Sequence, residues 1–318
     1  VAFIDDSLNP YRDAASGGPE RHPHDPLISE IGDATNQDSN AQIGYHRTGV
    51  TKRIAGEWDN GTPDRSRRVV VAENYSDSLT ALPARQLRIT GGSKLLLDNQ
   101  LLVVTDSITF SSSSDEIRLV NNGQLITTHD DKTPRITGDG KLYIDIEAAV
   151  ASLYRFNYMS SPVNTVGQDS FTVAGVMKDG TEPTSLQSIP KEINFIDGLD
   201  GNHDNPNGAI SIPNFWIYSY VNSEGLFDWV RKGGTGSLNQ TEGFIFKGPG
   251  KSQNYTFSGT PKDGTLTTFI NMNQHYLVGN PYASALNSKK FIRDNIESID
   301  GSLYFWDRDV GNPSNSHA

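Results

Sequence analysis

The sequence contains no cysteine, and this absence sets the first limit on what the protein can be. A chain without thiols has no disulfide framework, no thiolate zinc site and no cysteine nucleophile. Its rigidity has to come from backbone pairing and packing instead, which a stacked solenoid or a large sandwich provides.

Long apolar runs and basic stripes are also missing. The longest apolar runs are only a few residues, so the sequence predicts no membrane insertion. Lys and Arg number 27 against 38 Asp and Glu, which gives a net charge of −11. With that balance and no strongly basic stretch, we do not expect nucleic acid as a partner.

Turn-forming residues are abundant. The chain has 30 glycines and 16 prolines among many Asn, Asp, Ser and Thr residues, and the Ala/Leu/Glu/Lys blocks of long helices are absent. Frequent turns favour many short strands, so the sequence predicts a mainly β protein.

Three segments differ in pattern. Residues 1–55 are interrupted by prolines and glycines and are predicted to form an irregular N-terminal arm. Residues 56–149 are predicted to form a short β-solenoid (parallel β-helix), and residues 150–318 a β-sandwich-like surface-protein module. The chain starts at Val1 without an initiator Met, which suggests a mature or partial chain.

The solenoid prediction depends on repeated apolar residues separated by turn formers. A regular repeat of this kind is typical of coils that bury each turn against the next, although an antiparallel meander is the alternative. The first predicted column recurs every 16 to 17 residues and contains Leu87, Val103, Leu119 and Ile136. The second column follows the first a few residues later and contains Leu96, Phe110, Leu125 and Leu142.

The C-terminal segment shows short β-like runs between Gly- and Pro-bearing turns. The single predicted helix spans residues 283–295 after Pro281. The predicted strands are residues 153–158, 171–176, 215–221, 243–247, 255–258, 267–270, 276–278 and 302–306.

Several stretches resemble a known class of exported proteins. Residues 56–104 are similar to the opening of β-helical modules in surface proteins of Bacteroidota. The runs YRFNYMSSPV, LVGNPYASAL and LYFW, within residues 150–306, resemble a module of flavobacterial proteins exported by the type nine secretion system. The resemblance implies an extracellular, cell-surface location, and it carries no catalytic residues. Such chains normally continue past LYFW, so we expect a fragment or processed product.

An Asx-rich loop is the predicted metal site. Oxygen ligands at alternate positions suit a hard cation, so the candidate cofactor is Ca²⁺. The loop departs from the EF-hand template, and a solvated Asx turn is the alternative interpretation. The candidate ligands are Asp197, Asp200, Asn202, Asp204 and Asn207.

Two further surface features are candidates for carbohydrate chemistry. Ser7, Ser78 and Ser107 follow an Asp and precede an apolar residue, which resembles the O-glycosylation pattern of Bacteroidota exported proteins. Five aromatic residues could stack on sugars, but alternation on one strand face makes core packing the preferred interpretation. They are Trp216, Tyr218, Tyr220, Phe227 and Trp229.

Together these features predict an extracellular structural or adhesive surface protein and not an enzyme. It would assemble with copies of itself into a filament, because solenoid ends can add strands, or form an adhesin stalk beside neighbouring modules of a longer chain. A module binding surface glycans is the alternative. A β-helical polysaccharide-cleaving enzyme is less favoured; its candidate carboxylates would be Asp98, Asp106, Asp115, Asp130 and Asp131.

Overall fold

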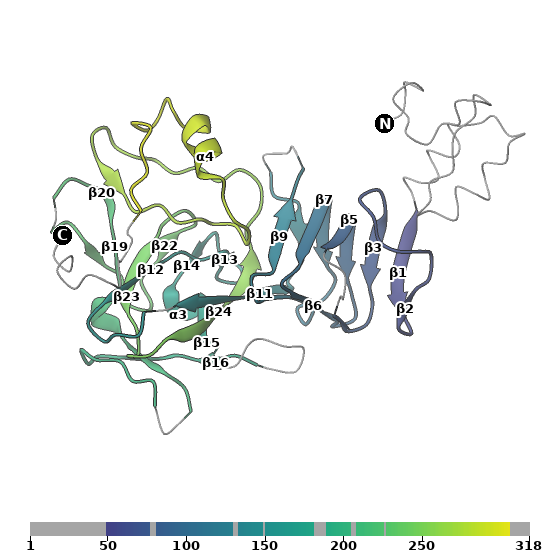
Figure 1. The fold of residues 1–318 in the computed structure, drawn as a ribbon, viewed down its shortest axis with the longest axis horizontal. Helices are drawn as coiled ribbons and strands as arrows, with labels where there is room; N and C mark the ends of the chain where they lie inside the picture. The colour runs from purple at the N-terminus through teal and green to yellow at the C-terminus, as the bar shows by residue number, and fades with distance from the viewer. Residues whose placement is uncertain are drawn as a thin grey trace, which may run out of the picture.

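A computed structural model describes residues 49–76, 81–129, 133–148, 150–180, 189–204, 208–225 and 227–305. It is 43% strand and 6% helix, and a β-solenoid precedes further sheets, so the predicted fold class is confirmed (Figure 1). No helix in these ranges is long and apolar enough to span a membrane. Most of the predicted arm, residues 1–48, lies outside the described residues.

Each turn of the solenoid contributes to three parallel ladders. Face 1 contains β1 (Val50–Ile54), β3 (Arg68–Val71), β10 (Ile136–Thr137) and the C-terminal halves of β5 (Ala81–Ile89) and β7 (Leu101–Phe110). Face 2 contains β4 (Tyr75–Ser76), β6 (Lys94–Asp98), β8 (Glu116–Val120) and β11 (Lys141–Ala148). Face 3 contains the N-terminal halves of β5 and β7 with β9 (Gln124–Thr127).

The predicted period of 16 to 17 residues is wrong. On face 1, Val69 pairs with Leu87, which pairs with Ile108, which pairs with Ile136. Successive turns therefore add 18, 21 and 28 residues. The spacing is irregular because the connections between ladders differ in length while the inward-pointing apolar residues stay in register. Leu119, predicted to lie in the column of Leu87, belongs to face 2.

The N-terminal end of the solenoid is covered by its own chain. β1 lies within the segment predicted to be irregular, so the solenoid begins at Val50. The hairpin strand β2 (Glu57–Trp58) pairs with the outer edge of β1. Asp59 exchanges two hydrogen bonds with the Lys52 backbone, and the Asn60 amide donates to the Val50 carbonyl over 2.9 Å.

The opposite end of the solenoid continues directly into the C-terminal part. The nine-residue strand β24 (Gln253–Pro261) pairs antiparallel with β11 over seven residue pairs. The Leu125 amide on β9 donates to the Ala283 carbonyl. The predicted units therefore share one sheet, and Figure 1 shows the stacked strands ending against the C-terminal part.

The C-terminal part consists of small sheets around a second region of the core. Phe171, Phe244 and Phe257 are fully buried there. Beyond β24 its strands are β12 (Phe156–Met159), β13 (Val163–Asn164), β14 (Ser170–Phe171), β15 (Met177–Asp179), β16 (Lys191–Glu192), β17 (Asn194–Ile196), β18 (Ser211–Pro213), β19 (Tyr218–Ser219), β20 (Val221–Ser223), β21 (Val230–Arg231), β22 (Leu238–Asn239), β23 (Phe244–Lys247) and β25 (His275–Tyr276).

Three short helices complete the C-terminal part. They are α3 (Val173–Val176), the 3₁₀ turn η2 (Asn214–Trp216) and α4 (Ser288–Asp294). The predicted helix over 283–295 starts later, because Asn287 caps α4 by accepting from the Lys290 amide while Ala283 is engaged with β9. Residues 267–270 are not a strand, and neither is the described part of the predicted strand at 302–305.

Candidate binding surfaces and the polar junction

Face 1 of the solenoid points a row of cations toward solvent. Along β3 and β5 the apolar residues Val69 and Leu87 are buried, and their neighbours point outward because side chains alternate along a strand. Four cations stand on the outward side of face 1, and we call this surface the cationic face. Its members are Lys52 on β1, Arg68 on β3, Arg88 on β5 and Arg135 immediately before β10.

Three of these four cations have no carboxylate partner within the described part of the chain. Among the described residues, Lys52, Arg68 and Arg88 form no ion pair, and the Arg88 Nε donates to the Ser111 hydroxyl over 2.9 Å. Arg135 pairs with Asp106. The cationic face therefore carries a local positive charge on a chain whose net charge is −11.

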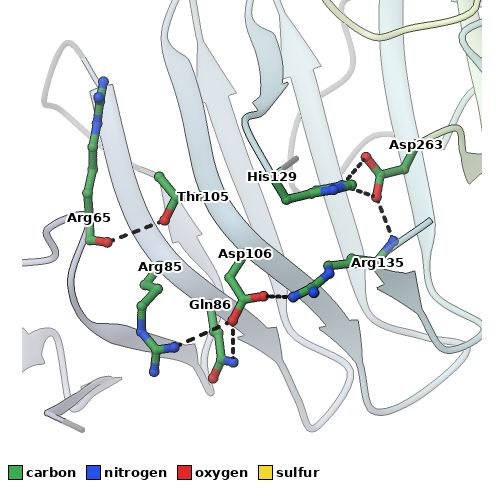
Figure 2. Close-up of polar contacts among 8 residues, drawn as sticks. All are labelled: Arg65, Arg85, Gln86, Thr105, Asp106, His129, Arg135 and Asp263. Carbon is green, nitrogen blue, oxygen red and sulfur yellow. Dashed lines mark hydrogen bonds and ion pairs between the residues drawn. The ribbon is translucent and has the colours of Figure 1, made fainter. Parts of the chain in front are cut away.

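Asp106 is the centre of a group of polar contacts beside the cationic face. It accepts from Arg135 with one oxygen and from Gln86, at 2.7 Å, with the other. Arg85 lies 3.5 Å from the same carboxylate (Figure 2). The register between β5 and β7 shifts next to Gln86, and this irregularity turns the three residues toward one another.

A second polar group joins the solenoid to the C-terminal part, and we call it the junction. Asp263 accepts from the Thr127 hydroxyl at 2.8 Å, from His129 Nε2 at 2.9 Å and from the Arg135 amide at 2.7 Å. The Asp263 side chain is 1% exposed and that of His129 is 6% exposed. Figure 2 shows the His129 ring directed at this carboxylate.

Hydrogen bonding keeps Asp263 charged. Burial alone would raise the pKa of Asp263, but hydrogen bonds from the Arg135 amide, Thr127 and His129 lower it below its usual range. The carboxylate borders a cavity of about 280 Å³ whose other lining residues include Thr265 and Tyr282. His129 Nδ1 is buried and has no hydrogen-bond partner among the described residues, so the hydrogen bonds of this imidazole are those of Nε2.

The residue before Asp263 is a buried cation. Lys262 donates to the carbonyls of Ser161 and Gln240 over 2.8 and 2.7 Å, and its Nζ lies 4.7 Å from the Phe171 ring centroid. It pairs with no carboxylate in the described ranges. Burial lowers the pKa of Lys262 to about 7.

Two of the predicted calcium ligands, Asn202 and Asp204, have other partners in the structure. Lys251 Nζ lies 2.8 Å from both oxygens of Asp204, and the Asn202 side chain accepts from the Asp204 amide. Asp197 and Asp200 belong to the same turn region, and Asn207 lies outside the described residues. The part of the chain that the structure describes holds no group of three metal-ligating side chains, so Ca²⁺ remains a prediction.

Of the three predicted glycosylation sites, only Ser107 is described. It is half-buried on β7, opposite Gln86, at the cationic face. Ser7 and Ser78 lie outside the described residues.

The aromatic residues predicted to pack in the core point the other way. Ile217 and Ser219 are fully buried, so the alternating Trp216, Tyr218 and Tyr220 lie on the half-exposed side of the strand region. Lys247 Nζ stacks 3.5 Å from the Trp216 ring centroid. Phe227 is 95% exposed, and Trp229 packs against Tyr220.

The three candidate catalytic carboxylates that the structure describes lie in separate parts of the coil. Asp98 is the last residue of β6, Asp106 lies between the two halves of β7, and Asp115 precedes β8, so they occupy three different places along the coil. Asp115 accepts from the amides of Gly92, Ser111 and Ser112 and closes a turn. Asp130 and Asp131 lie outside the described residues.

Sequence reasoning missed the cationic face, the junction and Lys262. Three cations of the face lie in separate strands and Arg135 lies just before a fourth, so no basic run marks them, and only the correct register brings them together. His129 and Asp263 are 134 residues apart. The Lys262-Asp263 pair in the sequence gives no sign that one charge is buried.

Comparisons with known proteins give one match. A family model described as a domain of unknown function, DUF8693, matches residues 205–318. This region includes β24 and α4 and excludes the solenoid. No curated protein and no solved structure matches the chain.

Proposed function

We propose that this protein is an extracellular adhesive module in which the solenoid acts as a rigid stalk for the C-terminal part. The observation that carries the proposal is the continuous sheet from the solenoid into that part. Seven residue pairs join β11 to β24, and the junction around Asp263 adds buried hydrogen bonds beside this ladder. Two units coupled in this way move as one body.

The covered ends favour a stalk over a filament. Strand addition needs an edge with unpaired backbone groups. The outer edge of β1 is engaged by β2 and Asp59, and the last strand of face 2 is engaged by β24. A homopolymer would have to use other surfaces, and neighbouring modules of a longer chain are the partners that a stalk implies.

The proposed location and the absence of catalysis have separate support. The resemblance of residues 150–306 to flavobacterial exported modules supports the cell surface. The separation of Asp98, Asp106 and Asp115 supports a structural role for these carboxylates, because a polysaccharide-cleaving site needs its acids together.

Negative-stain electron microscopy and small-angle scattering of the native protein test the stalk. We expect discrete, elongated monomers at all concentrations. Regular fibres would overturn the stalk in favour of the filament. Protease treatment of intact producing cells tests the location, because a surface protein is cleaved while an internal one is protected.

A further inference from the structure

The cationic face has the features of a binding site for a linear polyanion. Face 1 consists of five strands stacked about 4.8 Å apart along the solenoid axis. Outward cations that form no ion pair among the described residues stand on three adjacent strands, Lys52 on β1, Arg68 on β3 and Arg88 on β5. Arg135, next to β10, is paired with Asp106. An extended chain lying along the axis would meet a positive charge on each of β1, β3 and β5.

Apart from Val50 and Val70, the residues beside the cations have side chains that form hydrogen bonds. Lys52, Val70, Arg88, Thr109 and Thr137 form one outward column, and Gln86 and Ser107 belong to the next. Neither column contains an aromatic residue. A ligand for this surface therefore combines negative charges with hydroxyl groups, and it is not bound by ring stacking.

These features distinguish among polyanions. Proteins bind single-stranded nucleic acid with aromatic platforms for the bases, and they read duplexes by inserting an element into a groove. The cationic face offers neither. Guanidinium groups bind carboxylate and sulfate in a bidentate manner, and hydroxyl and amide side chains suit sugar hydroxyls.

We propose that the cationic face binds an acidic polysaccharide whose chain runs along the solenoid axis. This inference deepens the proposed adhesive function by naming its ligand class. Binding to the face is nevertheless measured independently of the shape of the molecule, so a failed stalk and a failed binding site give different results.

The test uses the full chain and polygalacturonate as the carboxylated probe, with neutral dextran as the uncharged comparison. We expect binding of polygalacturonate at low ionic strength that weakens with added NaCl, because salt screens exposed charges. Dextran should not bind. No measurable binding of polygalacturonate, or equal binding of dextran, would overturn the proposal.

Charge-matched variants locate the site. The variant K52Q/R68Q/R88Q should weaken binding about 100-fold, since each cation near an anionic surface contributes a several-fold factor. The control K289Q/K290Q/R293Q removes the same charge from exposed positions in α4 and should change affinity less than about threefold. Equal losses in both variants would show charge attraction without a site.

Two further measurements keep the test decisive. The variant R68K/R88K retains the charge and should lose only part of the affinity, because lysine cannot bind in a bidentate manner. It also controls for folding, together with circular dichroism of each variant. Tighter binding of single-stranded DNA than of polygalacturonate, lost in K52Q/R68Q/R88Q, would assign the face to nucleic acid and overturn the proposal.

Discussion

At the scale of single residues, Lys262 is the most unusual group in the protein. A lysine that is 6% exposed usually has a carboxylate partner, and this one has two carbonyls and a phenyl ring. Carbonyls accept from the neutral amine as well as from the ammonium. The site therefore tolerates the uncharged form. Burial disfavours the ammonium and lowers the pKa of Lys262 to about 7.

This residue predicts how stability depends on pH. Between about pH 7 and about pH 10 the unfolded chain binds a proton at Lys262 that the native chain has lost, so stability rises with pH. We expect the unfolding free energy of the wild type to increase relative to Lys262→Met, by up to about 1.4 kcal/mol per pH unit. Urea unfolding at several pH values measures it.

The control for this prediction is Lys289→Met, which removes an exposed lysine in α4. Its stability should follow the wild type across the same pH range. Parallel curves for the wild type and Lys262→Met would show that the lysine is charged in the native state.

At the scale of elements, the turn after β10 depends on close backbone packing. Gly138 has φ +92°, and a Cβ there would lie 2.0 Å from the Phe110 carbonyl oxygen. Gly91 also has positive φ, at +73°, but a Cβ there would meet nothing within 4 Å. The two glycines thus share the conformational requirement and differ in the available space.

Alanine substitutions separate these two effects. Gly91→Ala should cost about 1 kcal/mol of unfolding free energy for the left-handed backbone alone. Gly138→Ala should cost about 3 kcal/mol, because the collision with the Phe110 carbonyl adds to it. Denaturant unfolding of both variants gives the difference, and equal costs would mean that the β10 turn can move away from β7.

The sequence predicts the elements better than their alignment. Turn formers such as Gly138 and buried residues such as Leu87 are recognisable because glycine and branched apolar side chains have strong local preferences. The register of the strands cannot be recognised in this way, because Val103 on face 3 and Leu119 on face 2 are branched apolar residues like those of face 1. Connections of unequal length then remove the fixed period.

The contacts of the candidate site residues also depend on how the strands are aligned. The direction of Trp216 and Tyr218 depends on which side of the strand faces the core, and alternation alone fits both choices. The sequence marks Asp106 as a candidate catalytic carboxylate. Its role as the partner of Arg135 depends on the stacking of β7 and β10. Long-range contacts of this kind have no local signal.

At the scale of the whole molecule, the shared sheet predicts one cooperative unfolding transition. Trp58 lies in the N-terminal cap, and Trp216 lies in the C-terminal part. Two variants are compared, one with Trp58 and one with Trp216 as its single tryptophan. If β11, β24 and the junction couple the two halves, both variants should give the same midpoint in thermal fluorescence scans. Two separate midpoints would show independent domains.

A substitution in the junction, compared with one at the surface, tests this coupling. Asp263→Ala leaves several buried donors without an acceptor, so it should lower stability by about 3 kcal/mol and split the two midpoints. Asp204→Ala removes an exposed carboxylate paired with Lys251 and should change stability by less than about 0.5 kcal/mol. An unsplit transition in Asp263→Ala would assign the coupling to the β11–β24 ladder alone.

The stacking of strands across the solenoid axis also determines how the molecule carries a mechanical load. Tension along the axis acts directly on the hydrogen bonds between successive strands, so the coil yields by unpeeling one turn at a time from an end. The turn between Leu87 and Ile108 has 21 residues, and releasing it adds about 70 Å of extended chain. A stalk of this design lengthens in steps and dissipates a pull before the C-terminal part is strained.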